Sequence, residues 1–405
     1  MHVLFVHPNF PAQFGPVAFR LAATPGYRCT FLSQKREGVV RGVRCLRYTT
    51  RGGATGRTHY CSRTFENAVW HAAGVYEALA TAPDVRPDLV VGHSGFGSTL
   101  FARDLYPGVP VVNLFEYFYR PADSDLDFRP DFPPRPADRL RARARNAMIL
   151  LDLDNCDLGY CPTAWQLDRF PAEYRPKLRT LFDGVDTTLW KPDPAAPRRV
   201  GGRGVPPGVK LVTYVSRGLE SMRGFDLFMR AAKVVCDRRA DVLFAVVGED
   251  RVCYGGDERF TGGKSFKEWV LAQDRYDPER FVFTGRLPEA ELAALFAATD
   301  LHVYLTVPFV LSWSVLNAMA CGAVVLASDT APVREVIEHG KTGLLAPFFD
   351  PGAFADAIGR VLDDPPAYRP LGDAAAALVN ERFALDVCAP GFLRLCADSR
   401  ARAAP

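Results

Sequence analysis

The stretch at residues 305–329 constrains the fold of this chain more than any other part. An apolar run ends at Thr306, a loop of small and aromatic residues follows, and a short helix pattern covers residues 314–321. Gly322 ends that helix, and residues 323–327 are apolar enough for a buried strand. A loop that leads from a parallel strand into a helix exposes unpaired backbone N–H groups. The stretch therefore predicts an α/β sheet with an anion site at a strand end.

Asn317 is out of place on this helix pattern. Its sequence neighbours are apolar, and the helical period puts it on the same side as Trp313 and Ser314, one turn earlier. A polar residue in such a setting is expected to meet a ligand or a specific partner.

Length and charge exclude several classes of protein. The 405 residues suffice for two or three domains, and a net charge of +3 is too small to argue for nucleic-acid binding. No apolar run approaches the roughly 18–20 residues of a membrane span. The chain begins with a strand pattern and no basic leader, so we expect no signal peptide and a cytoplasmic location.

The ten cysteines form no metal-binding pattern. The closest pair, Cys156 and Cys161, has no His or Cys partner at metal-ligand spacing. We therefore expect reduced, buried thiols and no metal site.

Short apolar strands separated by helix patterns recur in both halves of the chain, which predicts parallel α/β sheets. The predicted strands cover residues 2–6, 89–92, 111–114, 158–160, 210–215, 242–247, 281–284, 301–306, 323–327 and 342–346. Residues 191–208, rich in Pro, Gly and Arg, have the composition of a linker. The Pro-rich residues 128–136 are expected to form a surface excursion.

Two arginines lie six residues apart in the loop that follows the strand at residues 210–215. Arg217 and Arg223 are each followed by Gly. Guanidinium groups present fork-like donors that suit phosphate oxygens, and Gly lets the backbone approach an anion. Two surface arginines on an ordinary loop are the alternative. The anion-ready loop at residues 306–314 favours a diphosphate site.

Several motifs together carry a resemblance to a known family. They are Ser216-Arg217-Gly218, Met222-Arg223-Gly224-Phe225, Val247-Gly248-Glu249, Phe283-Thr284-Gly285-Arg286-Leu287-Pro288, Asn317-Ala318-Met319-Ala320-Cys321-Gly322, Cys161-Pro162-Thr163 and Asp183-Gly184-Val185-Asp186. The chain resembles the bacterial retaining glycosyltransferases of family 4. Its loop Pro-Phe-Val-Leu-Ser-Trp-Ser at residues 308–314 resembles that of a subgroup.

The resemblance implies the α/β fold known as GT-B, in which two Rossmann-like domains face each other across a cleft. The acceptor-binding domain would cover residues 1–190 and the nucleotide-sugar domain residues 209–373, joined by the linker at 191–208. Residues 374–405 would form a C-terminal helix that returns to the first domain.

The resemblance also implies the residues of the donor site. Arg217 and Arg223 match a basic pair on the nucleotide diphosphate. Arg286 and Leu287 lie in the turn whose backbone reads the base. Gly248 falls in a further matching motif and is included in the expected site.

The two carboxylates of the family's Glu-x7-Glu motif are absent, because Phe309 and Asn317 occupy their positions. Asn317 would hold the ribose as a neutral partner, which is worth less than a charged one. Glu249 and Glu220 are candidates for compensation. Backbone N–H groups of three loop residues would bind the sugar in place of the first carboxylate: Val310, Leu311 and Ser312.

On the acceptor side, Gly15 would let the first loop approach the donor phosphates. His93 follows a strand and would orient a sugar hydroxyl or the transferring centre; a capping or core histidine is an equal alternative. Glu116 is flanked by aromatic residues that can stack on a sugar, which favours it over a solvated loop acid. We expect Arg217, Arg223, His93 and Glu116 to be the catalytic residues.

The arginines of residues 139–145 alternate with a period of two, which spreads their charges around a helix. A solvated helix is expected. Weak contact with the inner face of an anionic membrane, which would suit a lipid-linked acceptor, is the alternative.

The resemblance implies a metal-independent retaining glycosyltransferase without a cofactor. Its donor would be a nucleotide diphosphate sugar, for which the resemblance favours UDP-sugar, and its acceptor a glycan, a lipid-linked sugar or a small metabolite. Two alternatives remain: a degenerate member that binds a nucleotide sugar or glycan without transfer, and a nucleotide-sugar epimerase or hydrolase of the same fold.

Overall fold

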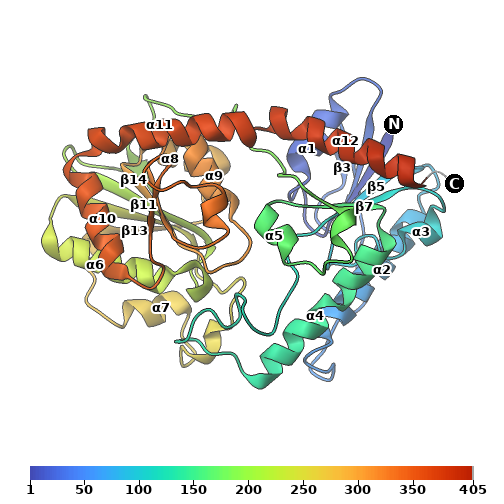
Figure 1. Cartoon of the computed structure of the whole chain (residues 1–405), viewed down its shortest axis with the longest axis horizontal. Helices are drawn as coiled ribbons and strands as arrows, with labels where there is room; N and C mark the ends of the chain where they lie inside the picture. The colour runs from blue at the N-terminus through green and yellow to red at the C-terminus, as the bar shows by residue number, and fades with distance from the viewer. Residues whose placement is uncertain (404–405) are drawn as a thin grey trace. The chain divides into compact units, whose positions relative to one another are not determined.

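The computed structural model describes the backbone of residues 1–403 and the side chains of residues 1–402. By their contacts the residues form two compact units (Figure 1). Unit 1 contains Met1–Asp127, Pro133–Gly184 and the chain from Leu385 onward, and unit 2 contains Phe128–Phe132 and Val185–Ala384. Each unit is built on its own sheet.

The sheet of unit 1 has eight strands in the order β3-β4-β2-β1-β5-β6-β7-β8, parallel except for β3 at the edge. The strands are β1 (His2–Val6), β2 (Arg28–Ser33), β3 (Gly38–Val40), β4 (Val43–Arg47), β5 (Leu89–His93), β6 (Val111–Leu114), β7 (Leu158–Cys161) and β8 (Leu178–Thr180). The central strands are buried on both faces, as their continuous apolar sequences require.

Helices cover both faces of this sheet and enclose two apolar cores. They are α1 (Gly15–Ala22), α2 (Arg63–Ala80), α3 (Ala102–Leu105), α4 (Pro136–Asn155), α5 (Ala164–Asp168) and α12 (Leu385–Ala403). Phe392 of α12 packs 6.4 Å from the ring of Phe5 on β1. The last helix of the chain therefore belongs to unit 1.

The sheet of unit 2 is parallel, with the order β13-β12-β11-β14-β15-β16. Its strands are β11 (Lys210–Gly218), β12 (Val242–Glu249), β13 (Phe281–Gly285), β14 (Leu301–Tyr304), β15 (Val325–Ser328) and β16 (Leu344–Ala346). From β11 the strands follow the chain outward to β12 and β13 on one side, and from β14 to β15 and β16 on the other, so the strand order reverses between β11 and β14. The carboxyl ends of these two strands are where such sheets bind ligands.

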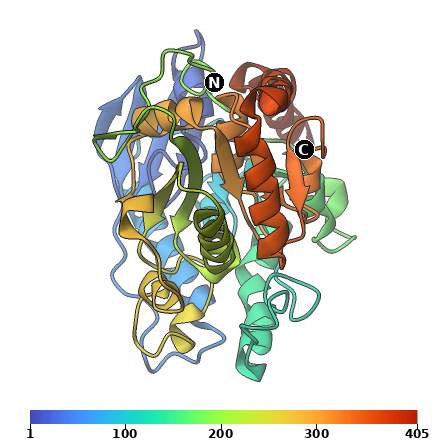
Figure 2. The same cartoon turned by 90° about the vertical axis from the view of Figure 1, so that its left-hand side faces the viewer.

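Two layers of helices cover the sheet of unit 2. They are α6 (Phe225–Arg238), α7 (Phe266–Leu271), α8 (Glu289–Ala298), α9 (Trp313–Ala320), α10 (Pro351–Asp363) and α11 (Pro365–Arg382). Helices α6 and α10 pack side by side, and α9 packs against α8 and α11 (Figures 1 and 2).

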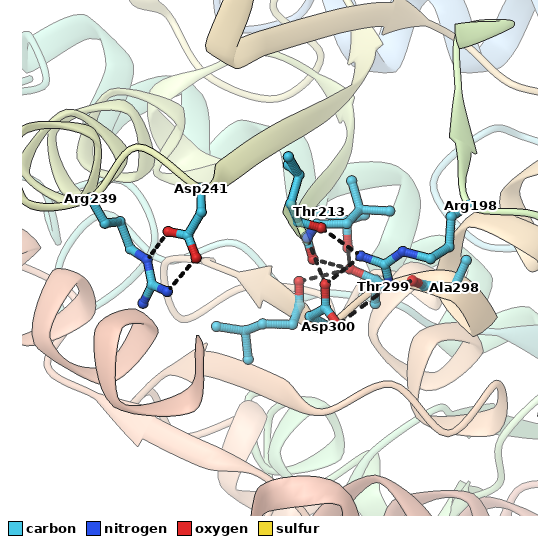
Figure 3. Close-up of polar contacts among 10 residues, drawn as sticks. Arg198, Thr213, Arg239, Asp241, Ala298, Thr299 and Asp300 are labelled. Carbon is cyan, nitrogen blue, oxygen red and sulfur yellow. Dashed lines mark hydrogen bonds and ion pairs between the residues drawn. The ribbon is translucent and has the colours of Figure 1, made fainter. Parts of the chain in front are cut away.

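The opposite end of the unit 2 sheet is held by polar contacts. Asp300 accepts hydrogen bonds from the Leu211 N–H at 2.6 Å and from Arg198 at 2.7 Å (Figure 3). The Thr299 hydroxyl donates to the backbone carbonyl of Leu211 at 3.0 Å. These contacts fix the register of β11 against β14 far from the strand ends that bind ligands.

The unit boundaries differ from the expected linker and final helix. The chain changes unit at Gly184/Val185 and again at Ala384/Leu385. Part of the Pro- and Gly-rich stretch forms a small antiparallel pair inside unit 2, β9 (Arg199–Val200) and β10 (Arg203–Gly204). Its composition reflects a tight turn rather than a domain boundary.

The segment Phe128–Phe132 is not the predicted surface excursion. It belongs to unit 2, and the Arg129 side chain is only 3% exposed there. Phe132 packs against Phe260 at 5.2 Å and Phe266 at 5.7 Å between ring centroids. The prolines that suggested a loop lie beside aromatic anchors that dock the segment.

The arginines of α4 are more engaged than a solvated helix predicts. The Arg145 guanidinium lies 3.6 Å from the ring centroid of Tyr119 and donates to its hydroxyl at 2.6 Å. Arg141 lies 4.7 Å from the ring centroid of Tyr60. Cation–π packing on tyrosines, rather than hydration alone, accommodates part of this charge.

The structure also bears on the expected reduced cysteines and on the membrane-span analysis. All ten cysteines carry free thiols, and most of them are buried. In the part of the chain that the structure describes, no helix is both long and apolar enough to cross a membrane.

Candidate functional site

A sharp turn places Arg223 at the carboxyl edge of the unit 2 sheet. β11 ends at Gly218, a 3-10 turn covers Ser221–Arg223, and α6 begins at Phe225. Gly224 between them has φ 61°, a conformation that favours glycine, and an added Cβ would lie 2.7 Å from the Leu305 side chain.

Arg223 is a buried cation that hydrogen-bonds to neutral oxygens. Its side chain is 5% exposed and donates to Thr306 Oγ1 at 2.6 Å, to the Val310 carbonyl at 3.1 Å and to the Tyr304 hydroxyl at 3.4 Å. Glu220 acts on it electrostatically, but among the described side chains no carboxylate forms an ion pair with it. A buried charge held only by neutral acceptors is a strong attractor for an anion.

Arg217 lies nearby in the chain, at the end of β11, and is exposed. Its guanidinium interacts electrostatically with the Tyr254 side chain. The ring of Tyr254 also contacts the second arginine, because the Arg223 guanidinium lies 5.3 Å from its centroid. The structure thus brings the predicted basic pair together around one tyrosine.

The loop before α9, residues 309–312, makes more contacts within the protein than the sequence predicts. Phe309 is 6% exposed, with its ring 5.5 Å from that of Tyr254, and the Val310 carbonyl accepts from Arg223. The Ser312 N–H donates to the Tyr304 hydroxyl at 2.9 Å, so the prediction that this N–H is available to a sugar is wrong. The Ser312 side chain caps α9 instead. Leu311 is 7% exposed.

The two acids proposed to compensate for Asn317 have other partners. Glu249 pairs with Arg251 at 2.6 Å. Glu220 is fully buried, and its Oε2 accepts the N–H groups of Cys253 and Tyr254 at 2.6 and 2.9 Å. Glu220 therefore holds the loop of Cys253 and Tyr254, whereas Glu249 is partly exposed and shares its charge with Arg251.

The remaining predicted donor residues surround the same strand ends. Gly248 ends β12 close to β11, where an added Cβ would lie 2.7 Å from the Ser216 carbonyl oxygen. Arg286 is exposed directly after β13, Leu287 follows it, and Asn317 is half-buried on α9.

In unit 1, the structure brings His93 and Glu116 together. His93 ends β5 and is 3% exposed, and its Nε2 lies 3.4 Å from Glu116 Oε2. Its Nδ1 lies 3.2 Å from Nε2 of His7. The Gln13 amide donates to the other Glu116 oxygen at 2.8 Å. The result is a chain of polar contacts from His7 through His93 to Glu116.

The electrostatics of this cluster keep Glu116 ionised. Burial by itself raises the pKa of the Glu116 carboxyl, but the charge and hydrogen bond of His93 and the hydrogen bond from Gln13 hold it at about 2. An ionised carboxylate cannot act as a general acid at neutral pH. Its geometry is suited to orienting His93.

Sequence reasoning missed His7 and Gln13. A signal was present, because β1 and β5 are adjacent parallel strands in which Val6 pairs with Gly92. The residues that follow each of these, His7 and His93, must then meet at one edge of the sheet.

Gly15 has a structural role at the start of α1. It begins α1, and an added Cβ would lie 2.8 Å from Cβ of Pro11. Contact with the preceding loop therefore accounts for glycine at this position.

Asp152 of α4 supports the loop after His93. Its Oδ2 accepts from the Gly95 N–H at 2.8 Å and from the Ser94 hydroxyl at 3.0 Å, while Oδ1 is buried and, within the described chain, unpartnered. Burial raises the pKa of the Asp152 carboxyl from 3.8 to about 7, against the smaller opposing effect of these hydrogen bonds.

This raised pKa predicts a pH dependence of stability. Between pH of about 4 and 7, the folded protein keeps a proton on Asp152 that the unfolded chain releases, so stability falls as pH rises. Asp152→Asn does not titrate. The unfolding free energy of the natural protein minus that of the variant, measured by urea denaturation, should therefore decrease from pH 4 to 7 and level off above. A difference that does not change with pH would contradict this assignment.

Both halves of the chain match glycosyltransferase families. Residues 25–190 match the glycosyl transferase family 4 group, and residues 209–364 match the glycosyl transferases group 1. Among curated relatives, the D-inositol 3-phosphate glycosyltransferase of Corynebacterium jeikeium is 30% identical over 219 residues, which are 52% of this chain and 51% of that protein. The GDP-mannose-dependent alpha-(1-6)-phosphatidylinositol monomannoside mannosyltransferase of Mycolicibacterium smegmatis is 31% identical over 253 residues, 60% and 61% of the two chains.

Solved structures share the fold at low sequence identity. Anabaena HepE in complex with UDP-glucose has a TM-score of 0.70 and 15% identity, and the match covers 98% of this chain and 100% of that one. The predicted GT-B fold is confirmed. The chain therefore has the GT-B fold, and its two halves are similar to the family 4 group and to the group 1 glycosyl transferases. It spans about half the length of the first curated relatives that it matches.

No metal site emerges from the described part of the chain. Within it, no three His, Cys, Asp or Glu side chains are grouped so that they could hold a metal ion.

Proposed function

We propose that this protein transfers a sugar from a nucleotide diphosphate sugar, bound by unit 2, to an acceptor hydroxyl bound by unit 1. The observation that carries the proposal is Arg223 at the carboxyl edge of a parallel sheet, a buried cation that forms no ion pair with any described side chain. The exposed Arg217 adds a second fork of donors at this edge. The donor diphosphate would supply the missing negative charge.

In this proposal the arginine pair stabilises the charge that develops on the leaving diphosphate. The transfer proceeds with retention at the sugar and needs no metal ion, because the two guanidinium groups provide the positive charge. His93, oriented by Glu116, hydrogen-bonds the acceptor sugar or the reacting centre. The departing diphosphate takes the acceptor proton.

UDP-sugar is the favoured donor. HepE, which shares the fold, binds UDP-glucose, whereas the mycobacterial relative is named for GDP-mannose. The acceptor would be a glycan, a lipid-linked sugar or a small metabolite. A thermal-shift screen of UDP-, GDP- and dTDP-sugars tests the donor, because one stabilising compound identifies both base and sugar.

Arg217→Ala is expected to lower turnover well over tenfold, since it removes one of two cations at the diphosphate. Release of free nucleotide from the donor, followed by mass spectrometry, provides the measurement. Arg251→Ala is a matched control, because that exposed arginine pairs with Glu249. Near-normal kinetics in Arg217→Ala would overturn the assignment of the basic pair.

A binding protein without transfer is the second candidate, favoured by the neutral residues Phe309 and Asn317 and by the internal partners of Glu220 and Glu249. Binding of nucleotide sugars without any donor hydrolysis, across every acceptor tried, would support it. An epimerase or hydrolase of the same fold would instead consume the donor without an acceptor.

Asn317→Glu tests the register of the donor site. A carboxylate binds ribose hydroxyls more strongly than an amide, so nucleotide affinity should rise about threefold to tenfold. Isothermal titration with the stabilising nucleotide measures the change. Unchanged affinity would show that position 317 does not face the ribose.

A further inference from the structure

Tyr254 stands at the centre of the donor-side contacts, although nothing in the sequence motifs singled it out. It lies between β12 and α7 and is 40% exposed. Its ring contacts the Arg223 guanidinium and the Phe309 ring, and its side chain interacts electrostatically with Arg217. Tyr254 therefore touches both members of the basic pair.

The loop that carries Tyr254 is anchored on the arginine-bearing turn by two buried carboxylates. Glu220 accepts the backbone N–H groups of Cys253 and Tyr254. Asp257 accepts the Ser221 N–H at 2.7 Å and the Ser221 hydroxyl at 2.6 Å. These anchors lie on both sides of Tyr254 in the sequence, so its position is set by the same turn that positions Arg223.

Close packing supports this anchoring. An added Cβ on Gly218 would lie 2.3 Å from the Arg251 carbonyl oxygen and 2.8 Å from the Cys253 sulfur. The end of β11 and the Tyr254 loop thus touch backbone to backbone, and only glycine fits between them.

The direction of the Arg217 contact determines what the tyrosine can do. A guanidinium has donors and no acceptor, so the Tyr254 oxygen can only accept from Arg217. The phenolic proton is then left for another acceptor. A hydroxyl that accepts from a cation is polarised and becomes a stronger donor.

We propose that Tyr254 is a third donor to the donor diphosphate, with its hydroxyl relaying the charge of Arg217 to a phosphate oxygen. This inference rests on the proposed function and names a residue of the same site. The ring keeps water from the Arg223 guanidinium, and the hydroxyl binds the anion that this cation attracts.

The test compares Tyr254→Phe with the natural protein by isothermal titration, using inorganic pyrophosphate and the diphosphates UDP, GDP, dTDP and ADP. The phenylalanine keeps the ring and loses only the hydroxyl. We expect pyrophosphate and the bound nucleotide to lose affinity by the same factor, about tenfold to a hundredfold, because the lost bond is to a charged phosphate. Tyr276→Phe is the matched control, since that tyrosine packs on Phe281, away from the basic pair. It should bind as the natural protein does.

Several results would overturn the inference. One is equal affinity in Tyr254→Phe, and another is a loss seen with the nucleotide but not with pyrophosphate, which would place the bond on the base or ribose. In an Arg217→Ala background the effect of Tyr254→Phe should shrink, and full additivity would exclude the relay. If the natural protein binds pyrophosphate but no nucleoside diphosphate, the proposed function fails while the anion role of Tyr254 stands. A melting temperature close to that of the natural protein shows that the variants are folded.

Discussion

Replacing Arg223 by methionine should reduce donor turnover by about a hundredfold to a thousandfold, the loss typical when a preorganised donor is removed from a developing anion. The free protein should keep its stability or gain some, because Arg223 is 5% exposed and held only by neutral oxygens from Thr306, Val310 and Tyr304. Methionine has similar length and no charge to bury, so its apolar contacts can replace the costly cation. Loss of function with retained stability is the signature of a residue maintained for its ligand.

Two measurements separate these effects. Donor hydrolysis or transfer reports the first, and the thermal unfolding midpoint without ligand reports the second. Arg223→Lys keeps the charge but not the fork of donors, so it should lie between the natural protein and the methionine variant. A methionine variant with normal turnover, or one that unfolds far below the natural protein, would show that Arg223 is structural.

Asp226→Ala should destabilise unit 2 by about 3–5 kcal/mol, which is the cost of breaking a buried ion pair on one side. Arg129 and Asp226 are 3% and 2% exposed and lie 2.7 Å apart between nitrogen and oxygen. Arg129 also donates to the Ser221 carbonyl at 2.9 Å, at the start of the turn that carries Arg223. Without Asp226, Asp131 is the one carboxylate among the described side chains that still pairs with Arg129, and it is 44% exposed.

The loss in unfolding free energy is measured by urea unfolding, with circular dichroism and tryptophan fluorescence as independent probes. Arg203→Ala is the matched control in the same unit, because its pair with Glu279 is exposed on both sides and should be worth less than about 1 kcal/mol. A double variant, Arg129→Met with Asp226→Leu, should recover part of the loss since no charge stays buried. A loss of less than about 1 kcal/mol in Asp226→Ala would show that Arg129 finds sufficient compensation elsewhere.

Much of the sheet architecture follows from local pattern. The predicted strands at residues 111–114 and 281–284 correspond closely to β6 and β13. Their apolar runs and flanking glycines are properties of a few neighbouring residues. Strands β2 and β4 were missed because charged and polar residues interrupt their apolar pattern.

Among the predicted site residues, too, some follow from local sequence and others do not. Arg217 and Arg223 could be found because strand, turn and glycine lie within ten residues of each other. Sequence alone could not reveal the internal partners of Glu220 and Glu249 or the capping role of Ser312. A carboxylate or an N–H group acquires such a partner only when the folded loops come together.

The sequence by itself determined that both halves are parallel α/β sheets, that a basic pair follows one strand and that Phe309 and Asn317 replace two expected carboxylates. Only the tertiary structure decided which groups share a site. His7 meets His93 across 86 residues, and Arg129 meets Asp226 across 97. The physical reason is that periodicity and turn chemistry act over a few residues, whereas ion pairs, stacked rings and buried hydrogen bonds form between segments that only the packed sheet brings together.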